Sequence, residues 1–143
     1  MRIQVLSYEN AKALFNLRKE VFVNEQGFSA KEEIDFTDKF ALHIACYDND
    51  DVIACGRILI EGKIAHFCRI CVKKQYRYIG IGTILCEFMI DYAKREKCEK
   101  IVLNSQIHAI PFYEKMGFIQ GDEVMDAGIP HVRMMKPLSL LWE

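Results

Sequence analysis

The sequence lacks any long hydrophobic run and any excess of charge of one sign. No apolar stretch approaches the ~20 residues that a membrane-spanning helix needs, and the start, MRIQVLSYENAK, carries no apolar signal region. The 19 Lys and Arg residues nearly balance the 20 Asp and Glu residues, so the formal net charge is −1 and no broad attraction to nucleic acid or acidic membrane is expected. These absences predict a cytoplasmic protein that binds neither nucleic acid nor membrane.

Linkers, internal repeats and low-complexity segments are also missing. A chain of 143 residues is long enough for one domain with one buried core. Its composition, 51% apolar and 27% charged, is that of an ordinary globular protein. We expect a single domain over residues 1–143.

The six cysteines lack the pattern of a zinc site. Cys68 and Cys71 form the one close pair, and neither a second Cys-x-x-Cys nor a His-x-x-x-His follows. The pair lies in an expected strand, FCRICV, where alternation places residues three apart on opposite faces. We therefore predict no metal site, and buried, reduced thiols.

The hydrophobic pattern predicts strands that alternate with a few helices. The expected strands cover residues 2–6, 41–47, 52–60, 63–72, 100–104, 118–120 and 131–136, and shorter helices cover 8–22, 31–34 and 107–116. A long helix follows Gly82 and ends near Lys97, with Ile84, Phe88 and Tyr92 on its apolar face.

The segment QYRYIGIGTILCEFMIDYAKREK, residues 75–97, is the most informative part of the chain. Gly80 and Gly82 allow the backbone to approach a ligand, and the helix behind them adds unpaired N–H groups and a positive dipole end. These features indicate an anion site of phosphate size, although glycines before a helix can also form a plain loop. The segment is not a P-loop, because no Lys-Ser or Lys-Thr pair follows, and Leu85 breaks the GxGxxG pattern.

Two motifs in order carry a family resemblance. The strand end ICV at 70–72 and the pattern Arg77-x-x-Gly80-x-Gly82 resemble the pyrophosphate-binding core of the GCN5-related N-acetyltransferases, the GNAT family. The segment AIPFYEKMGF at 109–118 resembles the family's second hallmark, and RKEVFVNEQGF…EEIDFTD resembles the ElaA-like bacterial branch. The resemblance covers about residues 1–137. It implies a single α/β domain with a mixed, mostly antiparallel sheet flanked by helices.

The resemblance implies acetyl-coenzyme A as the cofactor. Its pyrophosphate would bind the amides between Arg77 and Thr83, and its pantetheine arm would pair with the backbone of 70–72, unless that segment is an ordinary strand. Gln106 stands where many members have a cofactor-binding Asn. The implied cofactor-binding residues are Ile70, Cys71, Val72, Arg77, Tyr78, Gly80, Ile81, Gly82, Thr83 and Gln106.

Acyl transfer from a thioester leaves a thiolate that needs a proton. Tyr113 matches the tyrosine that acts as this general acid in the family, although a tyrosine on an amphipathic helix can also be a core residue. The resemblance makes His66 the candidate general base, because it lies eleven residues before Arg77, the spacing at which the histone-acetylating branch of the family carries its glutamate base. Alternation places His66 on one face with Cys68, Ile70 and Val72. A strand histidine bonded to a neighbour is the other interpretation.

An acidic segment precedes the second expected strand. Glu33 and Asp35 are candidate substrate residues for a cationic amine, and with Asp38 they are rival bases, although a solvated acidic loop has the same pattern. Arg57 and Arg69 lie in apolar strands and need carboxylate partners, which this segment could supply.

The resemblance implies an acetyl-coenzyme A-dependent N-acetyltransferase. A primary amine, on a small molecule or a peptide, would attack the thioester directly in a ternary complex. Two alternatives remain: an acyl-homoserine-lactone synthase, whose front the LRKEVFVNEQGF stretch also resembles, and a coenzyme A-binding module without turnover. Edge strands near the C-terminus would allow a homodimer.

Overall fold

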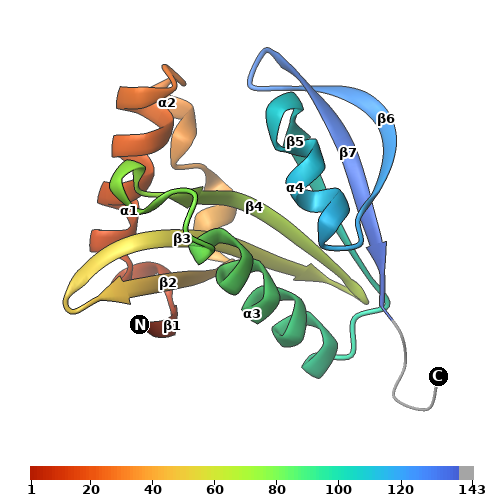
Figure 1. Cartoon of the computed structure of the whole chain (residues 1–143), viewed down its shortest axis with the longest axis horizontal. Coiled ribbons are helices and arrows are strands. Elements are labelled where there is room, and N and C mark those ends of the chain that lie inside the picture. The colour runs from red at the N-terminus through yellow and green to blue at the C-terminus, as the bar shows by residue number, and fades with distance from the viewer. Residues whose placement is uncertain (139–143) are drawn as a thin grey trace.

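The computed structural model describes residues 1–138, which contain seven strands in one sheet with the order β1-β2-β3-β4-β5-β7-β6 (Figure 1). The strands are β1 (Arg2–Leu6), β2 (Leu42–Asp48), β3 (Asp51–Glu61), β4 (Ile64–Val72), β5 (Lys100–Gln106), β6 (Ile119–Asp126) and β7 (Ile129–Pro137). The α-helices are α1 (Lys12–Arg18), α2 (Ala30–Glu33), α3 (Ile81–Arg95) and α4 (Ile110–Lys115). All neighbouring strands are antiparallel except β4 and β5, which α3 connects in parallel. The expected mixed, mostly antiparallel sheet is confirmed.

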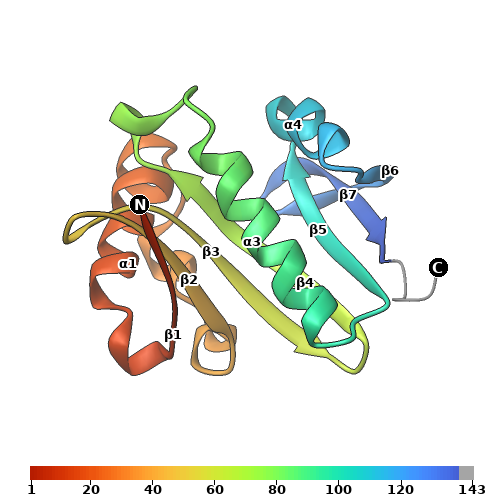
Figure 2. The same cartoon turned by 60° about the horizontal axis from the view of Figure 1, so that its bottom comes forward.

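Two apolar clusters hold helices on opposite faces of this sheet (Figures 1 and 2). Residues Leu85, Met89 and Ala93 of α3 pack with β2 through Ile44 and Cys46. On the other face, Leu14 and Leu17 of α1 pack with Ala45. The alternation along β2 therefore divides the core between the two helix layers.

The first helix differs from the expected span of 8–22. A 3-10 turn at Tyr8–Asn10 precedes α1, and a π-helix over Lys19–Glu25 continues it. The wider π turn still keeps Val21 and Phe22 buried, so the apolar pattern persists while its period changes. Apolar spacing alone does not separate an α-helix from a π-helix over so short a stretch.

A bulge in β4 overturns the expected alternation. Arg69 has a φ of 55°, and the pairing with β3 shifts so that Arg69 and Ile70 together oppose Gly56. Phe67 therefore packs on the α3 side, whereas Cys71 packs on the α1 side. The predictions that His66 shares a face with Ile70 and Val72, and that Cys68 and Cys71 face opposite ways, were wrong, because one extra residue reverses the sides beyond it.

Strands β4 and β5 separate at one end. Their pairing joins Ile64–Phe67 to Lys100–Leu103 only. Beyond these pairs, β4 continues to Val72 and β5 to Gln106 while the two strands diverge (Figure 2). The backbone of 68–72 is thus unpaired on its β5 side, which leaves a wedge in the sheet.

The C-terminal hairpin is longer than expected. The polar run QGDE ended the predicted strand at residue 120, yet β6 extends to Asp126 and pairs with β7. β6 lies at the edge of the sheet and is largely exposed, so it needs no apolar alternation. Within residues 1–138, no helix combines the length and apolarity required to span a membrane.

Candidate active site

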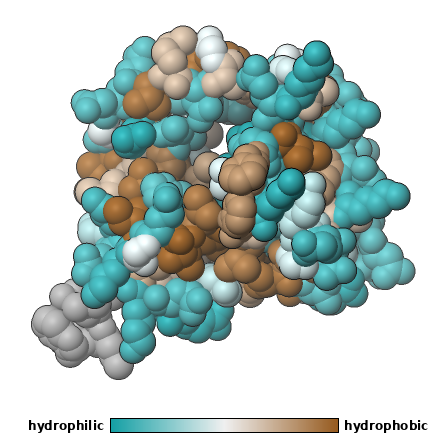
Figure 3. Space-filling view, turned by 180° about the vertical axis from the view of Figure 1, so that it is seen from behind, coloured by the Kyte–Doolittle hydropathy of each residue, from teal (hydrophilic) through white to brown (hydrophobic). Residues whose placement is uncertain are grey.

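A cleft of about 980 Å³ occupies the wedge between β4 and β5. An opening between the two halves of the molecule is visible from behind in Figure 3. The cleft brings together most of the predicted site residues, namely Glu33, Asp35, Ile70, Cys71, Val72, Arg77, Tyr78, Gly80, Gly82, Thr83, Gln106 and Tyr113. Ile81 packs instead in the apolar core, so that only its backbone can serve a ligand. His66 lies outside the cleft.

The start of α3 forms one wall of the cleft. Gly80 precedes the helix with a φ of 89°, a conformation that favours glycine. The first amide to bond within the helix is that of Ile84, which donates to the Gly80 carbonyl at 3.1 Å, and no side chain caps the helix start. The three amides between these residues are therefore available to an anion.

The side chain of Arg77 is held away from this cradle. Its Nε donates to the Val72 carbonyl at 2.8 Å, and its guanidinium forms a two-pronged ion pair with Glu25. The hydrogen bond from Arg77 lowers the pKa of Glu25. Arg77 thereby ties the end of the π-helix to the end of β4.

The other side of the cleft carries a second tie to the same segment. Gln106, at the end of β5, donates to the Gln26 side chain at 3.0 Å. Gln106 thus lies in the cleft, as expected of a cofactor contact, but its side-chain amide is hydrogen-bonded to Gln26, the residue after Glu25. The segment 25–26 therefore spans the wedge from β4 to β5.

Tyr113 lies on α4 with its ring between Phe112 and Phe118. Burial raises the pKa of Tyr113 above its ordinary value, and nearby thiols add to the shift. The phenol therefore stays protonated at neutral pH. Among the described residues its hydroxyl has no hydrogen-bond partner, yet it is not sealed from solvent, so it can donate into the cleft.

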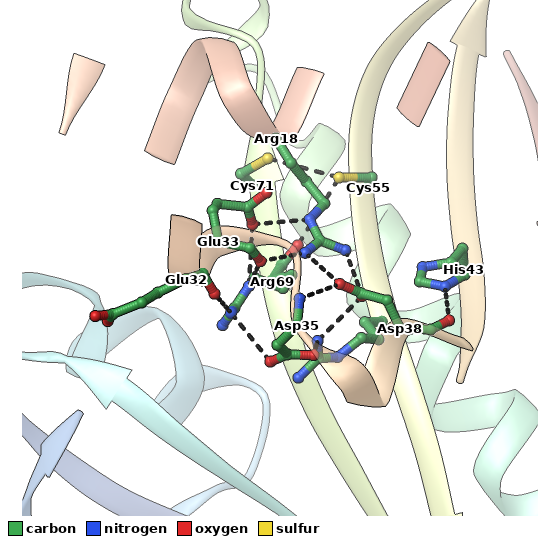
Figure 4. A network of polar contacts seen from close by, with 10 residues as sticks. Arg18, Glu32, Glu33, Asp35, Asp38, His43, Cys55, Arg69 and Cys71 are labelled. Atoms are coloured by element: carbon green, nitrogen blue, oxygen red, sulfur yellow. Dashed lines mark hydrogen bonds and ion pairs between the residues drawn. The ribbon is translucent and has the colours of Figure 1, made fainter. Parts of the chain in front are cut away.

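An ionic network lies behind the opposite wall of the cleft (Figure 4). Arg18 is its centre: it is fully buried and donates to Glu33 at 2.9 Å and to Asp38 at 2.8 Å. Arg57 pairs with Asp38 as well, and both Arg57 and Arg69 pair with Asp35. The expectation that the acidic segment supplies partners for the two strand arginines is confirmed.

This network is electrically balanced. Three arginines face three carboxylates, so the cluster as a whole has no surplus negative charge for a cationic amine. Burial disfavours the Asp38 carboxylate, but the hydrogen bonds and charge of Arg18 outweigh it and hold the pKa of Asp38 at about 2. Glu33 is buried, whereas the Asp35 side chain is 36% exposed in the cleft wall.

The structure places two histidines, His66 and His131, in different hollows of the molecule. His66 lines a different hollow, between β4 and the C-terminal hairpin, with its Nε2 3.2 Å from the Glu61 carboxylate. His131 of β7 lies in the main cleft and is buried. In the sequence, the spacing to Arg77 favoured His66 as the general base. For His131, the one available signal was its position between apolar strand residues.

Comparison with known proteins agrees with this arrangement. The acetyltransferase (GNAT) domain family matches residues 4–138. YjcF of Bacillus subtilis, described as an uncharacterized N-acetyltransferase, is 38% identical over 130 residues, or 90% of this chain and 93% of YjcF. ElaA of Escherichia coli superposes with a TM-score of 0.85 at 27% identity, over 95% of this chain and 99% of ElaA.

A more distant structure shares the fold. The PaiA N-acetyltransferase of Thermoplasma acidophilum, solved in complex with coenzyme A, has a TM-score of 0.73 at 20% identity, over 96% of this chain and 100% of that one. The matched domain, the named relatives and the split sheet with its glycine-started helix lead to one conclusion. The chain belongs to the GNAT family of N-acetyltransferases, in its ElaA-like branch.

Proposed function

We propose that this N-acetyltransferase takes its acetyl group from acetyl-coenzyme A and transfers it to a primary amine in a ternary complex. One observation carries the proposal: the free amides of the α3 start, the unpaired β4 edge and the Tyr113 hydroxyl all meet in one cleft. An anion site, an amide-pairing edge and a proton donor are what a pyrophosphate, a pantetheine arm and a leaving thiolate need.

The residues present fit such a cofactor. The backbone from Arg77 to Thr83 would hold the pyrophosphate, and the edge at 70–72 would pair with the amides of the pantetheine arm. A Cβ built on Gly82 would lie 3.5 Å from Phe112 and 3.6 Å from Val72, so the protein itself leaves room there. Glycine at this position thus keeps the backbone open to a ligand. Acetyl-coenzyme A supplies the acetyl thioester.

Tyr113 supplies the proton that the leaving sulfur requires. A phenol has a reference pKa near 10 and a thiol about 8.5, so the transfer is uphill, and burial of Tyr113 increases the difference. Direct protonation is effective because the hydroxyl is positioned in advance at the cleft.

The acceptor would enter from the side of α2 and the hairpin. Glu32 and Asp126 line the cleft there, and their carboxylates can attract an ammonium group. An amine on a small molecule or a peptide fits this description equally. Within residues 1–138, β6 pairs with the sheet on one side only, and its free edge would allow a homodimer.

Replacing Gly82 with valine tests the cofactor site. The methyl groups would occupy the space in front of the α3 amides, so coenzyme A affinity should fall about a hundredfold, or close to 3 kcal/mol. Titration calorimetry measures this directly. Glu87→Val is the comparison, because it places the same side chain at an exposed α3 position outside the cleft. Equal affinity in folded Gly82→Val and wild-type protein would remove the pyrophosphate assignment.

A further inference from the structure

His131 is the buried histidine of the cleft, and its ring is oriented by the backbone. Only 5% of the residue is exposed, and its Nδ1 lies 2.8 Å from the carbonyl oxygen of Ile129. A carbonyl oxygen only accepts hydrogen bonds, so Nδ1 carries the proton and Nε2 holds the free lone pair. The contact thus fixes the tautomer that a general base needs.

The free nitrogen opens to the cleft. Nε2 of His131 has no hydrogen-bond partner among the described residues. The one side-chain nitrogen or oxygen there that is both without a partner and sealed from solvent is Nδ1 of His43, so Nε2 of His131 is not sealed. His131 borders the cleft and is otherwise buried, so Nε2 meets solvent in the cleft itself. His131 also stands opposite Gln106 in the β5–β7 pairing, at the end of β5 that leaves β4.

The position of His131 suits the acceptor side of the reaction. Val132 and Met134 alternate with it and pack in the core under α3 and α4, so His131 faces the other way, out of that core. Asn104 and Asp126 are joined by a hydrogen bond of 3.3 Å on the strands that flank β7. The polar surface on this side is where an amine would be held.

We propose that His131 is the general base that accepts a proton from the acceptor ammonium, an inference that rests on the proposed function. His131 Nε2 takes one proton, and the freed nitrogen lone pair forms the bond to the acetyl carbon as the carbon–sulfur bond breaks. Tyr113 gives its proton to the leaving sulfur and regains one from the same nitrogen as the amide forms. One proton per turnover remains on His131 and passes to solvent.

Several charged and titratable groups share the cleft with His131 and can contribute to the pH–rate profile of the enzyme. From the elements next to it these are Asp126 on β6, His108 in the turn before α4 and Tyr113 on α4, and from the opposite walls Glu32, Glu33, Asp35, Arg57, Cys68, Arg69, Cys71, Tyr76, Arg77 and Tyr78. The test therefore compares the pH–rate profiles of variants that each replace one histidine.

His131→Asn is the decisive variant. The asparagine amide can still donate to the Ile129 carbonyl, while the basic nitrogen is lost. At pH 7 we expect kcat/KM for the amine to fall by roughly 10²–10³-fold, the rising limb of the pH–rate profile near neutrality to disappear, and added imidazole to restore part of the rate. His131→Gln is a second variant in case the first one folds poorly. Coenzyme A affinity by calorimetry confirms that each variant is folded.

His66→Gln is the matched comparison, since His66 lies outside the cleft, and it should keep the wild-type profile. Nitrogen-15 NMR of the free enzyme should show the Nδ1–H tautomer at His131, a readout independent of activity. A wild-type enzyme that acetylates amines while His131→Asn keeps both rate and profile would overturn this inference alone. A wild-type protein that consumes no thioester with any amine would overturn the proposed function with it.

Discussion

Tyr113→Phe should lower turnover by roughly 10²–10⁴-fold while coenzyme A affinity stays within about twofold of wild type. The substitution keeps the ring and its edge contacts with Phe112 and Phe118, and removes only the hydroxyl. Since that hydroxyl has no hydrogen-bond partner among residues 1–138, its loss leaves no protein group unpaired. Steady-state kinetics with saturating acetyl-coenzyme A, together with calorimetry, separates the loss of proton donation from any loss of binding.

The control for this variant is Tyr92→Phe. Tyr92 lies on α3 against the same apolar cluster but does not line the cleft, so loss of its hydroxyl should leave turnover unchanged. Near-normal turnover in Tyr113→Phe, with acetyl transfer shown to be rate-limiting, would mean that the Tyr113 hydroxyl has no part in the reaction. Proton donation would then fall to water.

Arg18→Met should destabilise the protein by about 3–5 kcal/mol, a large share of the ~5–15 kcal/mol that a domain of this kind has. Methionine replaces much of the volume of the buried side chain, but Glu33 and Asp38 then lose the guanidinium that both accept from. Asp38 keeps Arg57, whereas the Glu33 carboxylate keeps only Arg69. Urea unfolding at neutral pH measures the change.

A surface ion pair supplies the comparison for Arg18. Lys63 and Glu99 lie 3.6 Å apart with both side chains mostly exposed, so Lys63→Met should cost less than 1 kcal/mol. Unfolding curves of Arg18→Met and Lys63→Met that coincide would show that the buried network contributes no more than an exposed pair. The cleft wall would then depend on its apolar contacts instead.

The parts of the fold that were predictable follow from local signals. Gly80 and Gly82 marked the start of α3, and its apolar face and basic last turn set the rest of that helix. The strands β2 to β5 were recognised because runs such as IACGRILI are buried on both faces. Within the site, the glycine cradle and Tyr113 came from motifs in which spacing and residue type are both constrained.

The parts that were missed depend on contacts between distant segments. The β-bulge at Arg69 cannot be recognised from the alternation in FCRICV. This bulge alone determines which residues share a face of the sheet with His66. The central place of Arg18 in the ionic network depends on Glu33 and Asp38, which lie 15 and 20 residues further along the chain and contact it only in the folded structure. His131 became a candidate only when the β5–β7 register placed it at the wedge.

We propose that acetyl transfer from acetyl-coenzyme A to an amine takes place in the wedge between β4 and β5. The direct measurement is mass spectrometry of products formed from isotopically labelled acetyl-coenzyme A and a panel of amines, peptide N-termini and lysine side chains. We expect one labelled acetyl group on the nitrogen of at least one acceptor, free coenzyme A in equal amount, and a large decrease of both products in Tyr113→Phe. A lactone product, or coenzyme A binding with no labelled amide from any amine, would contradict it.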